Sequence, residues 1–299
     1  MSYYDFRWQV FMAVAQQLSF TRAAEQLYVT QPAVSKHIRE LELLMGVSLF
    51  QRKANRVELT QAGELVKSRL MQVFKIYGEM EYELGLLKNT ISGELRIAAS
   101  STIAQYVLPE YLSRFYEQYP HLRVSIVSGN SREVEELLEM NRADIGMVEG
   151  SSSRSGLVYL PFLDDELIAV ASPSYAATLP QKLSVGDLLS IPLVVREAGS
   201  GTLEVIDRVL QEQAVRVDQL NVVLQLGTTE GIKQFLEHAS CIGIVSKKSV
   251  EKELERGTLF AVPLKEISFK REFRIVLHSS QPAGSTALFL KDLLPTYNL

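Results

Sequence analysis

The sequence contains one cysteine, Cys241, in 299 residues, and it has no long apolar run. A single cysteine excludes an internal disulfide and a zinc site built from several thiolates, and it is typical of a reduced, cytosolic setting. No apolar stretch approaches the roughly 18 residues that a membrane span requires, and residues 1–8 are too polar for a signal peptide. We therefore expect a cytoplasmic protein with no membrane contact.

Motifs of the common enzyme families are also missing. The sequence has no P-loop, no Gly-x-Ser-x-Gly elbow, no His-Glu-x-x-His pair and no Gly-x-Gly-x-x-Gly loop. Its four histidines are scattered and lack the spacing of metal ligands. The sequence therefore predicts a protein that is not an enzyme and that has neither a metal site nor a cofactor.

The net charge of −4 is distributed unevenly along the chain. Residues 1–60 carry seven Lys+Arg and five Asp+Glu, a net +2, whereas residues 93–299 carry 20 and 26, a net −6. A basic segment joined to an acidic body is typical of a small DNA-binding domain carried by a larger one.

The stretch from Ser19 to Glu42 predicts two short helices joined by a turn, with Ser19 or Thr21 capping the first helix and Thr30 the second. Val34, Ile38 and Leu41 are spaced by four and three residues, so they share the buried face of the second helix. The opposite face suits the major groove of DNA, because amides and hydroxyls read base edges while basic groups meet phosphates. We interpret the stretch as a helix-turn-helix. Its candidate DNA-binding residues are Ser19, Thr21, Thr30, Gln31, Pro32, Ser35, Lys36 and Arg39.

Segments on either side complete this predicted head. Residues 6–17 predict a first helix that packs beneath the other two. Residues 48–60 change to the period of strands around a turn-like pair at 54–55, which predicts a small hairpin, or wing. The wing adds three candidates for phosphate or minor-groove contact, Arg52, Lys53 and Arg56, although a solvated run of charges is the simpler alternative.

One long helix is predicted from residue 61 to about residue 88. Its apolar residues alternate in spacing between four and three, which forms a heptad seam: Val66, Leu70, Val73, Tyr77, Met80, Leu84 and Leu87. A helix of roughly 40 Å cannot bury this stripe against the head alone. We expect it to pair two copies of the chain, so that two heads read half-sites related by a two-fold axis. The alternative is that it packs on the body of its own chain.

After an expected hinge at residues 89–93, the pattern changes to two sets of strand-helix-strand units. The first set has strands at 95–100, 122–127 and 144–148 with helices at 106–119 and 132–140. The second has strands at 193–196, 221–226 and 241–245 with helices at 202–213 and 229–238. Ile97 and Gly146 are 49 residues apart, as are Val194 and Gly243, so we infer an internal repeat that forms two α/β lobes.

Extended segments at 162–171 and 269–279 are expected to cross between the lobes, and a helix at 286–294 is expected to return to the first. The predicted division is therefore a head at 1–60, a linker helix with its hinge at 61–92 and an effector domain at 93–299. Within that domain, lobe I covers about 93–163 and 268–299, and lobe II about 164–267.

Over essentially its full length the chain resembles the LysR-type transcriptional regulators. The most specific part is Phe20 to Glu42, followed by Gly46, Leu49 to Arg52 and Leu59 to Gly63. The resemblance implies an all-α winged helix-turn-helix with a long linker helix, and an α/β two-lobed effector domain like a periplasmic binding protein. It also implies a dimer through the linker helix, a tetramer as the usual form on pseudo-palindromic double-stranded DNA, and a small-molecule effector between the lobes. RNA polymerase is a further candidate partner.

The candidate effector site lies at the ends of strands in both lobes, because ligands of open α/β sheets bind beyond the carboxyl ends of the strands. Hydroxyls and glycines recur there, where the N–H groups of helix starts can hold an anion. Each residue alone has a simpler interpretation as a helix cap. The candidates are Ser100, Ser101, Thr102, Ser128, Asn130, Glu149, Glu197, Ser200, Gly201, Thr202, Thr228 and Thr229.

We expect a small, polar, anionic effector, either an inorganic oxyanion or a small carboxylate. The segment Glu197 to Thr202 resembles that of LysR-type branches which control sulfur assimilation and carbon fixation, and whose effectors are small anions. Glu149 and Glu197 oppose this expectation, because a carboxylate that faces the ligand repels an anion. We expect both to pair with Arg96, Arg196 or a backbone N–H, unless the ligand carries an amino group.

Two other functions stay open at this level. An enzyme or solute binder with an accessory dimerisation head would turn over or hold a metabolite, and it would show no salt-dependent binding to an operator. A constitutive architectural DNA binder would not respond to any metabolite.

Overall fold

The computed structural model describes residues 5–53, 56–87, 93–151, 153–278, 282 and 284–294. The chain forms two compact units, Met1–Leu84 and Gly85–Leu299. The turn expected at residues 54–55 and residues 89–92 of the hinge expected at 89–93 lie outside the described residues, and Gly93 begins a strand. Among the residues described, none of the helices combines the length and the apolar character that a membrane span requires.

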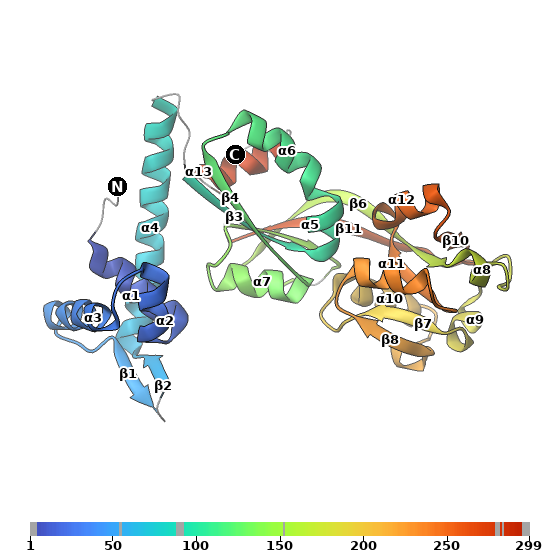
Figure 1. Ribbon diagram of the computed structural model, residues 1–299, viewed down its shortest axis with the longest axis horizontal. Coiled ribbons are helices and arrows are strands. Elements are labelled where there is room, and N and C mark those ends of the chain that lie inside the picture. Colours follow the sequence, from blue (N-terminus) through green and yellow to red (C-terminus); the bar gives the residue numbers. More distant parts are fainter. Residues whose placement is uncertain are drawn as a thin grey trace. The chain divides into compact units, whose positions relative to one another are not determined.

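The first unit is a winged helix-turn-helix followed by a long helix (Figure 1). Its elements are α1 (Phe6–Gln17), α2 (Phe20–Leu27), α3 (Gln31–Met45), β1 (Phe50–Lys53), β2 (Arg56–Leu59) and α4 (Gln61–Leu87). Ser19 caps α2 by accepting a hydrogen bond from the Arg22 N–H at 3.3 Å. Thr30 stands at the N-cap position of α3, but its side chain makes no capping hydrogen bond, so that part of the prediction is wrong.

The core of the head joins all three helices to the wing. Val34, Ile38 and Leu41 of α3 are buried against α1, as their spacing predicts. The Glu42 carboxylate accepts hydrogen bonds from the backbone N–H groups of Leu49 (2.7 Å) and Phe50 (3.2 Å). This acidic residue therefore fastens the first strand of the wing to the recognition helix.

The apolar seam of α4 is buried at its beginning and is half-buried or exposed further along. Val66 and Leu70 pack on the core of the head. Further along, Val73 and Leu84 are exposed, and Leu87 is 83% exposed. A long helix with an exposed apolar stripe is typical of a helix that pairs with another chain.

A single sheet runs through the second unit, with strands in the order β4-β3-β5-β11-β6-β9-β7-β8 and β10 paired to β6. Lobe I begins with β3 (Gly93–Ser100), α5 (Ser101–Tyr106), α6 (Leu108–Gln118), β4 (Leu122–Gly129), α7 (Ser131–Glu139) and β5 (Ile145–Glu149). The strand β6 (Val158–Ala171) leads to lobe II, and β11 (Phe269–Leu277) leads back to α13 (Gly284–Leu293), which packs on lobe I. Lobe II comprises α8 (Pro173–Ala176), α9 (Val185–Ser190), β7 (Leu193–Arg196), α10 (Gly201–Gln211), the 3₁₀ turn η1 (Val217–Gln219), β8 (Val222–Leu226), α11 (Thr229–Leu236), β9 (Ile242–Ser246), α12 (Lys247–Arg256) and β10 (Phe260–Val262).

The two lobes repeat one topology. In lobe I, β3 is parallel to β4 and β5, and in lobe II, β7 is parallel to β8 and β9. Helices cover both faces of each lobe; in Figure 1, α7 lies on one side of the lobe I strands and α6 and α13 lie on the other. A β-carbon on Gly146 would lie 2.5 Å from Leu138 of α7, and one on Gly243 would lie 2.8 Å from Leu236 of α11. The paired glycines of the predicted repeat therefore let equivalent helices pack closely on equivalent strands.

The expectations for single elements are wrong at several places. The helix predicted at 106–119 is α6, which starts two residues later, and a separate short helix, α5, which begins directly after β3, was not predicted. Pro109 stands in the first turn of α6, where a missing N–H suits a helix start and not a continuous helix. The short helices α8 and α9, the helix α12 and the strand β10 were not predicted.

Candidate DNA-binding and effector sites

The N-terminal turns of α3 present a polar surface on the outside of the head. Gln31, Pro32, Lys36 and Arg39 are exposed, and Ser35 is half-buried. The Gln31 Nε2 donates a hydrogen bond to the Ser35 Oγ at 2.8 Å. The two side chains therefore form one hydrogen-bonding unit with the amide oxygen of Gln31 and the hydroxyl proton of Ser35 left for a partner.

The wing places its basic residues beside this surface. Arg52, Lys53 and Arg56 are exposed, and Lys53 lies opposite Arg56 in the hairpin. A cavity of about 160 Å³ between α3 and the wing is lined by Ser35 and Arg52, so these two candidates lie on the same side of the head. Thr21 and Thr30 are exposed, whereas Ser19 is half-buried at the cap of α2.

In the effector domain, eight of the twelve candidates meet where lobe I faces lobe II. All eight are buried, and we call them the interlobe cluster. They are Ser100, Ser101, Thr102, Glu149, Ser200, Gly201, Thr202 and Thr229. Gly201 is required for the close approach, because a β-carbon there would lie 2.4 Å from the backbone oxygen of Glu149.

Glu149 is at the centre of the cluster and is 1% exposed. Its carboxylate accepts hydrogen bonds from the Ser100 hydroxyl at 2.8 Å and from the Thr202 hydroxyl at 3.0 Å. It is also paired with Arg271, whose Nη1 lies 2.5 Å from its Oε2. One carboxylate thus binds a strand end of lobe I, a helix start of lobe II and the crossing strand β11.

Burial alone would raise the pKa of the Glu149 carboxyl, because a charge is poorly solvated there. The Arg271 guanidinium and the Ser100 hydroxyl outweigh burial and lower this pKa below its ordinary value. Glu149 is therefore ionised at neutral pH, and the cluster already contains an anion.

Arg271 and Asp165 are the site residues that the sequence analysis missed. The Arg271 Nε donates to the Asp165 carboxylate at 2.7 Å, and the Ser246 hydroxyl donates to the same carboxylate at 2.7 Å. Both residues are buried, and on each strand the residues two positions before and after them are apolar. Phe269 and Phe273 flank Arg271 in this way. A charged residue on the inward side of an alternating strand was the available signal, since it requires a buried partner.

Arg196 organises the other part of the cluster. Its guanidinium is paired with Glu197 at 2.8 Å and donates to the Thr229 hydroxyl at 3.1 Å. The Thr102 and Thr229 hydroxyls lie 3.4 Å apart across the lobes. Glu197 therefore pairs with Arg196 as expected.

Glu149 pairs with Arg271 and not with Arg96. Arg96 instead binds the Asp144 carboxylate at 2.6 Å, within lobe I. The expectation that Arg96 neutralises a carboxylate of the effector site is therefore wrong.

Two polar atoms of this region are buried without a hydrogen-bond partner among the described residues, the Ser101 Oγ and the Arg271 Nη2. Buried polar groups are nearly always paired, with protein, water or a ligand. Both atoms can donate a hydrogen bond, so the region has an unused capacity to hold an acceptor.

Four candidates lie away from the cluster. Ser128 is exposed on the edge strand β4, Asn130 caps α7 and Thr228 caps α11. The side chain of Glu197 is 26% exposed and is paired with Arg196. For Asn130 and Thr228 the structure supports the simpler interpretation as caps.

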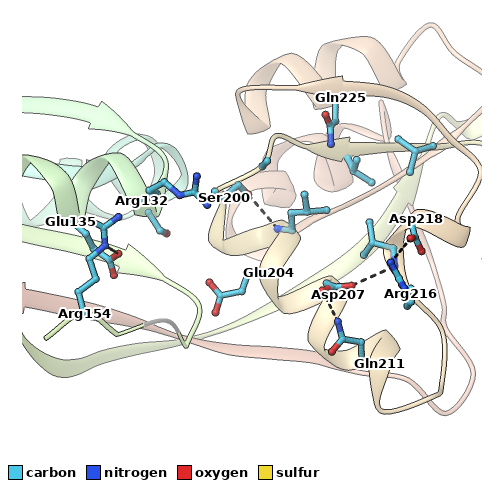
Figure 2. Close-up of a pocket in the computed structure, with 17 residues that line it drawn as sticks. Arg132, Glu135, Arg154, Ser200, Glu204, Asp207, Gln211, Arg216, Asp218 and Gln225 are labelled. Carbon is cyan, nitrogen blue, oxygen red and sulfur yellow. Dashed lines mark hydrogen bonds and ion pairs between the residues drawn. The ribbon is translucent and has the colours of Figure 1, made fainter.

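A cavity of about 1130 Å³ opens beside the cluster between α7 and α10. Figure 2 shows Arg132, Glu135 and Arg154 on its lobe I side and Glu204, Asp207 and Arg216 on its lobe II side. Arg154 is neutralised by Glu135, Glu136 and Glu139, and Arg216 by Asp218. Ser200 belongs to the interlobe cluster and also lines the cavity, so the cavity lies next to the cluster.

No group of three or more His, Cys, Asp or Glu within the described part of the chain could hold a metal ion.

The head and the paired lobes define a class of protein, a DNA-binding regulator with a two-lobed ligand-binding domain. Residues 7–64 match the family described as "Bacterial regulatory helix-turn-helix protein, lysR family". Residues 88–296 match "LysR substrate binding domain". The chain belongs to the LysR family of transcriptional regulators, and it is a regulator and not an enzyme.

Two relatives and one solved structure indicate which branch of the LysR family the chain resembles. The "HTH-type transcriptional regulator CysL" of Bacillus subtilis is 31% identical over 92% of this chain and 90% of its own. A "Probable RuBisCO transcriptional regulator" of Thalassiosira pseudonana is 30% identical over 97% of both chains. The regulatory domain of CcmR from Synechocystis, solved in complex with 2-PG, is 27% identical with a TM-score of 0.61, over 68% of this chain and 97% of that one. These similarities agree with the predicted resemblance to the sulfur-assimilation and carbon-fixation branches.

Proposed function

We propose that this regulator binds a pseudo-palindromic double-stranded operator, and that a small polar anion held between its lobes changes that binding. It acts in the cytoplasm as a dimer through α4 or as a tetramer, with RNA polymerase as a further partner. The proposal keeps the division at 1–60, 61–92 and 93–299, with lobe I at about 93–163 and 268–299 and lobe II at about 164–267. The exposed part of the α4 seam supports the pairing, because Val73, Leu84 and Leu87 are 40%, 38% and 83% exposed in one chain.

The observation that supports an anionic effector is a pair of unused donors, one in the interlobe cluster and one on Arg271 beside it. Ser101 Oγ and Arg271 Nη2 are buried without partners, and Arg271 is a cation fixed at the junction of the lobes. A guanidinium beside several hydroxyls matches the acceptor atoms of an oxyanion or a carboxylate. The complex of the related CcmR domain with 2-PG supports a small-molecule effector in this domain.

The two carboxylates that are paired with Arg271 determine how such an anion binds. Arg271 carries one positive charge and touches two carboxylates, Glu149 and Asp165, so an added anion would be repelled. An incoming anion therefore displaces Glu149 from the guanidinium of Arg271 and from the hydroxyls of Ser100 and Thr202. It also accepts hydrogen bonds from the two donors that Glu149 does not use, Ser101 Oγ and Arg271 Nη2. Effector binding is an exchange of one anion for another at the same donors.

Calorimetry on the full chain tests the ligand class. We expect one compound to bind among sulfite, sulfate, thiosulfate and a set of small carboxylates, and we expect matched small amines not to bind. Binding only of uncharged or cationic compounds would reject the anion.

A second experiment tests the DNA face. Gln31→Ala and Ser35→Ala should reduce the ratio of operator to random-duplex affinity, because these side chains are placed to read bases. Arg52→Ala should weaken both affinities alike and reduce the slope of log affinity against log salt by about one, because it meets a phosphate. The operator is obtained by footprinting the DNA upstream of the chain's own gene. An equal loss of affinity for both duplexes in Gln31→Ala would show that Gln31 does not read bases.

A further inference from the structure

Tyr28, in the turn between α2 and α3, is the most exposed of the large apolar and aromatic residues in the described part of the chain, at 95%. It was predicted only as part of the turn, and neither the fold nor the sites above give its side chain a task. The ring adds nothing to the core of the head, so packing does not explain it.

The backbone conformation at Tyr28 is also unusual for a tyrosine. Tyr28 adopts the left-handed conformation, with φ 54° and ψ 40°, at the end of α2. Glycine and asparagine are the residues that favour this position, and a bulky aromatic side chain is disfavoured there. Local conformation therefore also fails to explain a tyrosine, and a residue held in such a conformation is a reason to look for a function.

The turn holds Tyr28 in a fixed direction. Its backbone N–H donates to the carbonyl of Glu25 at 3.2 Å, and the N–H of Val29 donates to that of Ala24 at 3.0 Å. Val29 then packs on the core of the head. The side chain of Tyr28 consequently projects from a rigid base and not from a flexible loop.

The position of Tyr28 along the chain limits its distance from Gln31, a candidate DNA-binding residue. It precedes Gln31 by three residues, so their Cα atoms are at most about 11 Å apart. In a helix-turn-helix the first residues of the recognition helix enter the major groove, which is about 12 Å wide. An exposed tyrosine attached within this distance of Gln31 is long enough to reach the rim of the groove, where the phosphates lie.

We propose that Tyr28 positions the head on its operator, with its phenol hydroxyl donating a hydrogen bond to a backbone phosphate next to the bases read by Gln31. Tyrosine is among the residues that make such contacts, which fix register and carry no sequence information. The hydroxyl is neutral, so the contact releases no condensed counterion. This separates Tyr28 from the basic residues of the wing.

The test compares Tyr28→Phe and Tyr28→Gly with the wild-type full chain on the operator duplex and on a random duplex, across a salt series. Tyr28→Phe should weaken both affinities by about three- to tenfold per head with an unchanged salt slope, since one neutral hydrogen bond is lost. Tyr28→Gly should weaken binding at least as much, while the head melts at the same temperature or higher, because glycine favours this backbone conformation. A structural role would move stability and binding in the same direction.

Tyr116→Phe is the matched control, because Tyr116 is an exposed tyrosine on α6 of the effector domain. It should leave DNA binding unchanged. Wild-type affinity of Tyr28→Phe on both duplexes would overturn the phosphate contact, and so would a loss confined to the operator, which would indicate base reading. Absence of DNA binding by the wild-type chain itself would instead reject the wider proposal for the head.

Discussion

At the scale of single residues, Arg271 and its two carboxylates determine what the space between the lobes can bind. Glu149 lies 2.5 Å and Asp165 2.7 Å from the guanidinium, and all three side chains are almost fully buried. Burying such charges is costly unless every group is paired and hydrogen-bonded. The hydroxyls of Ser100 and Thr202 supply those bonds to Glu149, and the hydroxyl of Ser246 supplies one to Asp165.

Glu149→Gln should therefore convert the cluster into a stronger anion site. The amide keeps the size of the side chain but removes the charge that competes for Arg271. We expect the affinity for the effector anion to rise at least about tenfold, and the free energy of unfolding without anion to fall by roughly 2–4 kcal/mol, because Arg271 loses a partner. Titration calorimetry and chemical denaturation with and without the anion measure both quantities.

Glu197→Gln is the control for that experiment. Glu197 pairs with Arg196 and is partly exposed, so its charge does not compete for Arg271. Anion affinity should change little. If both variants bind the anion as the wild type does, Glu149 does not exchange with the effector.

Sequence patterns predicted that strand ends of the two lobes meet, but not which residues lie in the interlobe cluster. Asn130 and Thr228 look like Ser100 and Thr202 in the sequence, because helix capping and ligand binding use the same residue types. Asn130 and Thr228 serve only as caps, whereas Ser100 caps α5 and also lies in the interlobe cluster with Thr202. The difference depends on the sheet that brings the lobes together, which no local pattern contains.

At the scale of elements, the prediction was accurate for several segments that are rich in apolar residues. The helix α1 has the predicted bounds, and the two crossing segments are the long strands β6 and β11. The helix α12 was missed because it is strongly polar, with buried residues only at Ser249 and Val250. The helix α5 was missed because its buried Ser101 and Thr102 look like a loop.

Gly201 shows how one element limits the approach of another. It begins α10, and a β-carbon there would lie 2.4 Å from the backbone oxygen of Glu149 at the end of β5. Gly201→Ala should push α10 away from β5, lower the free energy of unfolding by about 1–3 kcal/mol and weaken effector binding. Denaturation and calorimetry on the full chain test this.

Gly186→Ala gives the matched comparison within the same lobe. Gly186 lies in α9, and the nearest atom to its added β-carbon is the Ser184 Oγ at 3.7 Å. Alanine should stabilise this helix by up to about 1 kcal/mol, because glycine costs conformational entropy there. Equal behaviour of the two variants would show that Gly201 is not needed for close approach.

At the scale of the whole effector domain, a second contact between the lobes lies away from Arg271. Tyr106 of α5 donates its hydroxyl to Glu230 of α11, and Lys233 lies 3.2 Å from the same hydroxyl. Lys233 is buried and is also paired with Glu253 of α12 at 2.9 Å. One phenol of lobe I therefore joins two helices of lobe II, and this contact forms only when the lobes are together.

In the folded state, the phenol of Tyr106 stays protonated to a higher pH than it does in the unfolded chain. Burial and the Glu230 carboxylate raise the pKa of Tyr106 to about 12, whereas an unfolded tyrosine ionises near 10. The hydroxyl therefore contributes its full stability below pH 10, and the contribution is lost as the pH rises toward 12. The contact is intact at every physiological pH, so it can be removed only by mutation.

Tyr106→Phe should weaken lobe closure and with it the effector response. The matched control is Tyr159→Phe, whose hydroxyl binds Glu135 and the Arg154 N–H entirely within lobe I and whose pKa is also raised to about 12. Both variants should lose stability below pH 10, but only Tyr106→Phe should reduce effector affinity, by about three- to tenfold, because it alone removes a bond that closure makes. Calorimetry measures the affinity, and denaturation at pH 8 and pH 11.5 measures the stability. Unchanged effector affinity in Tyr106→Phe, with stability lost as in Tyr159→Phe, would show that the two lobes close without this contact.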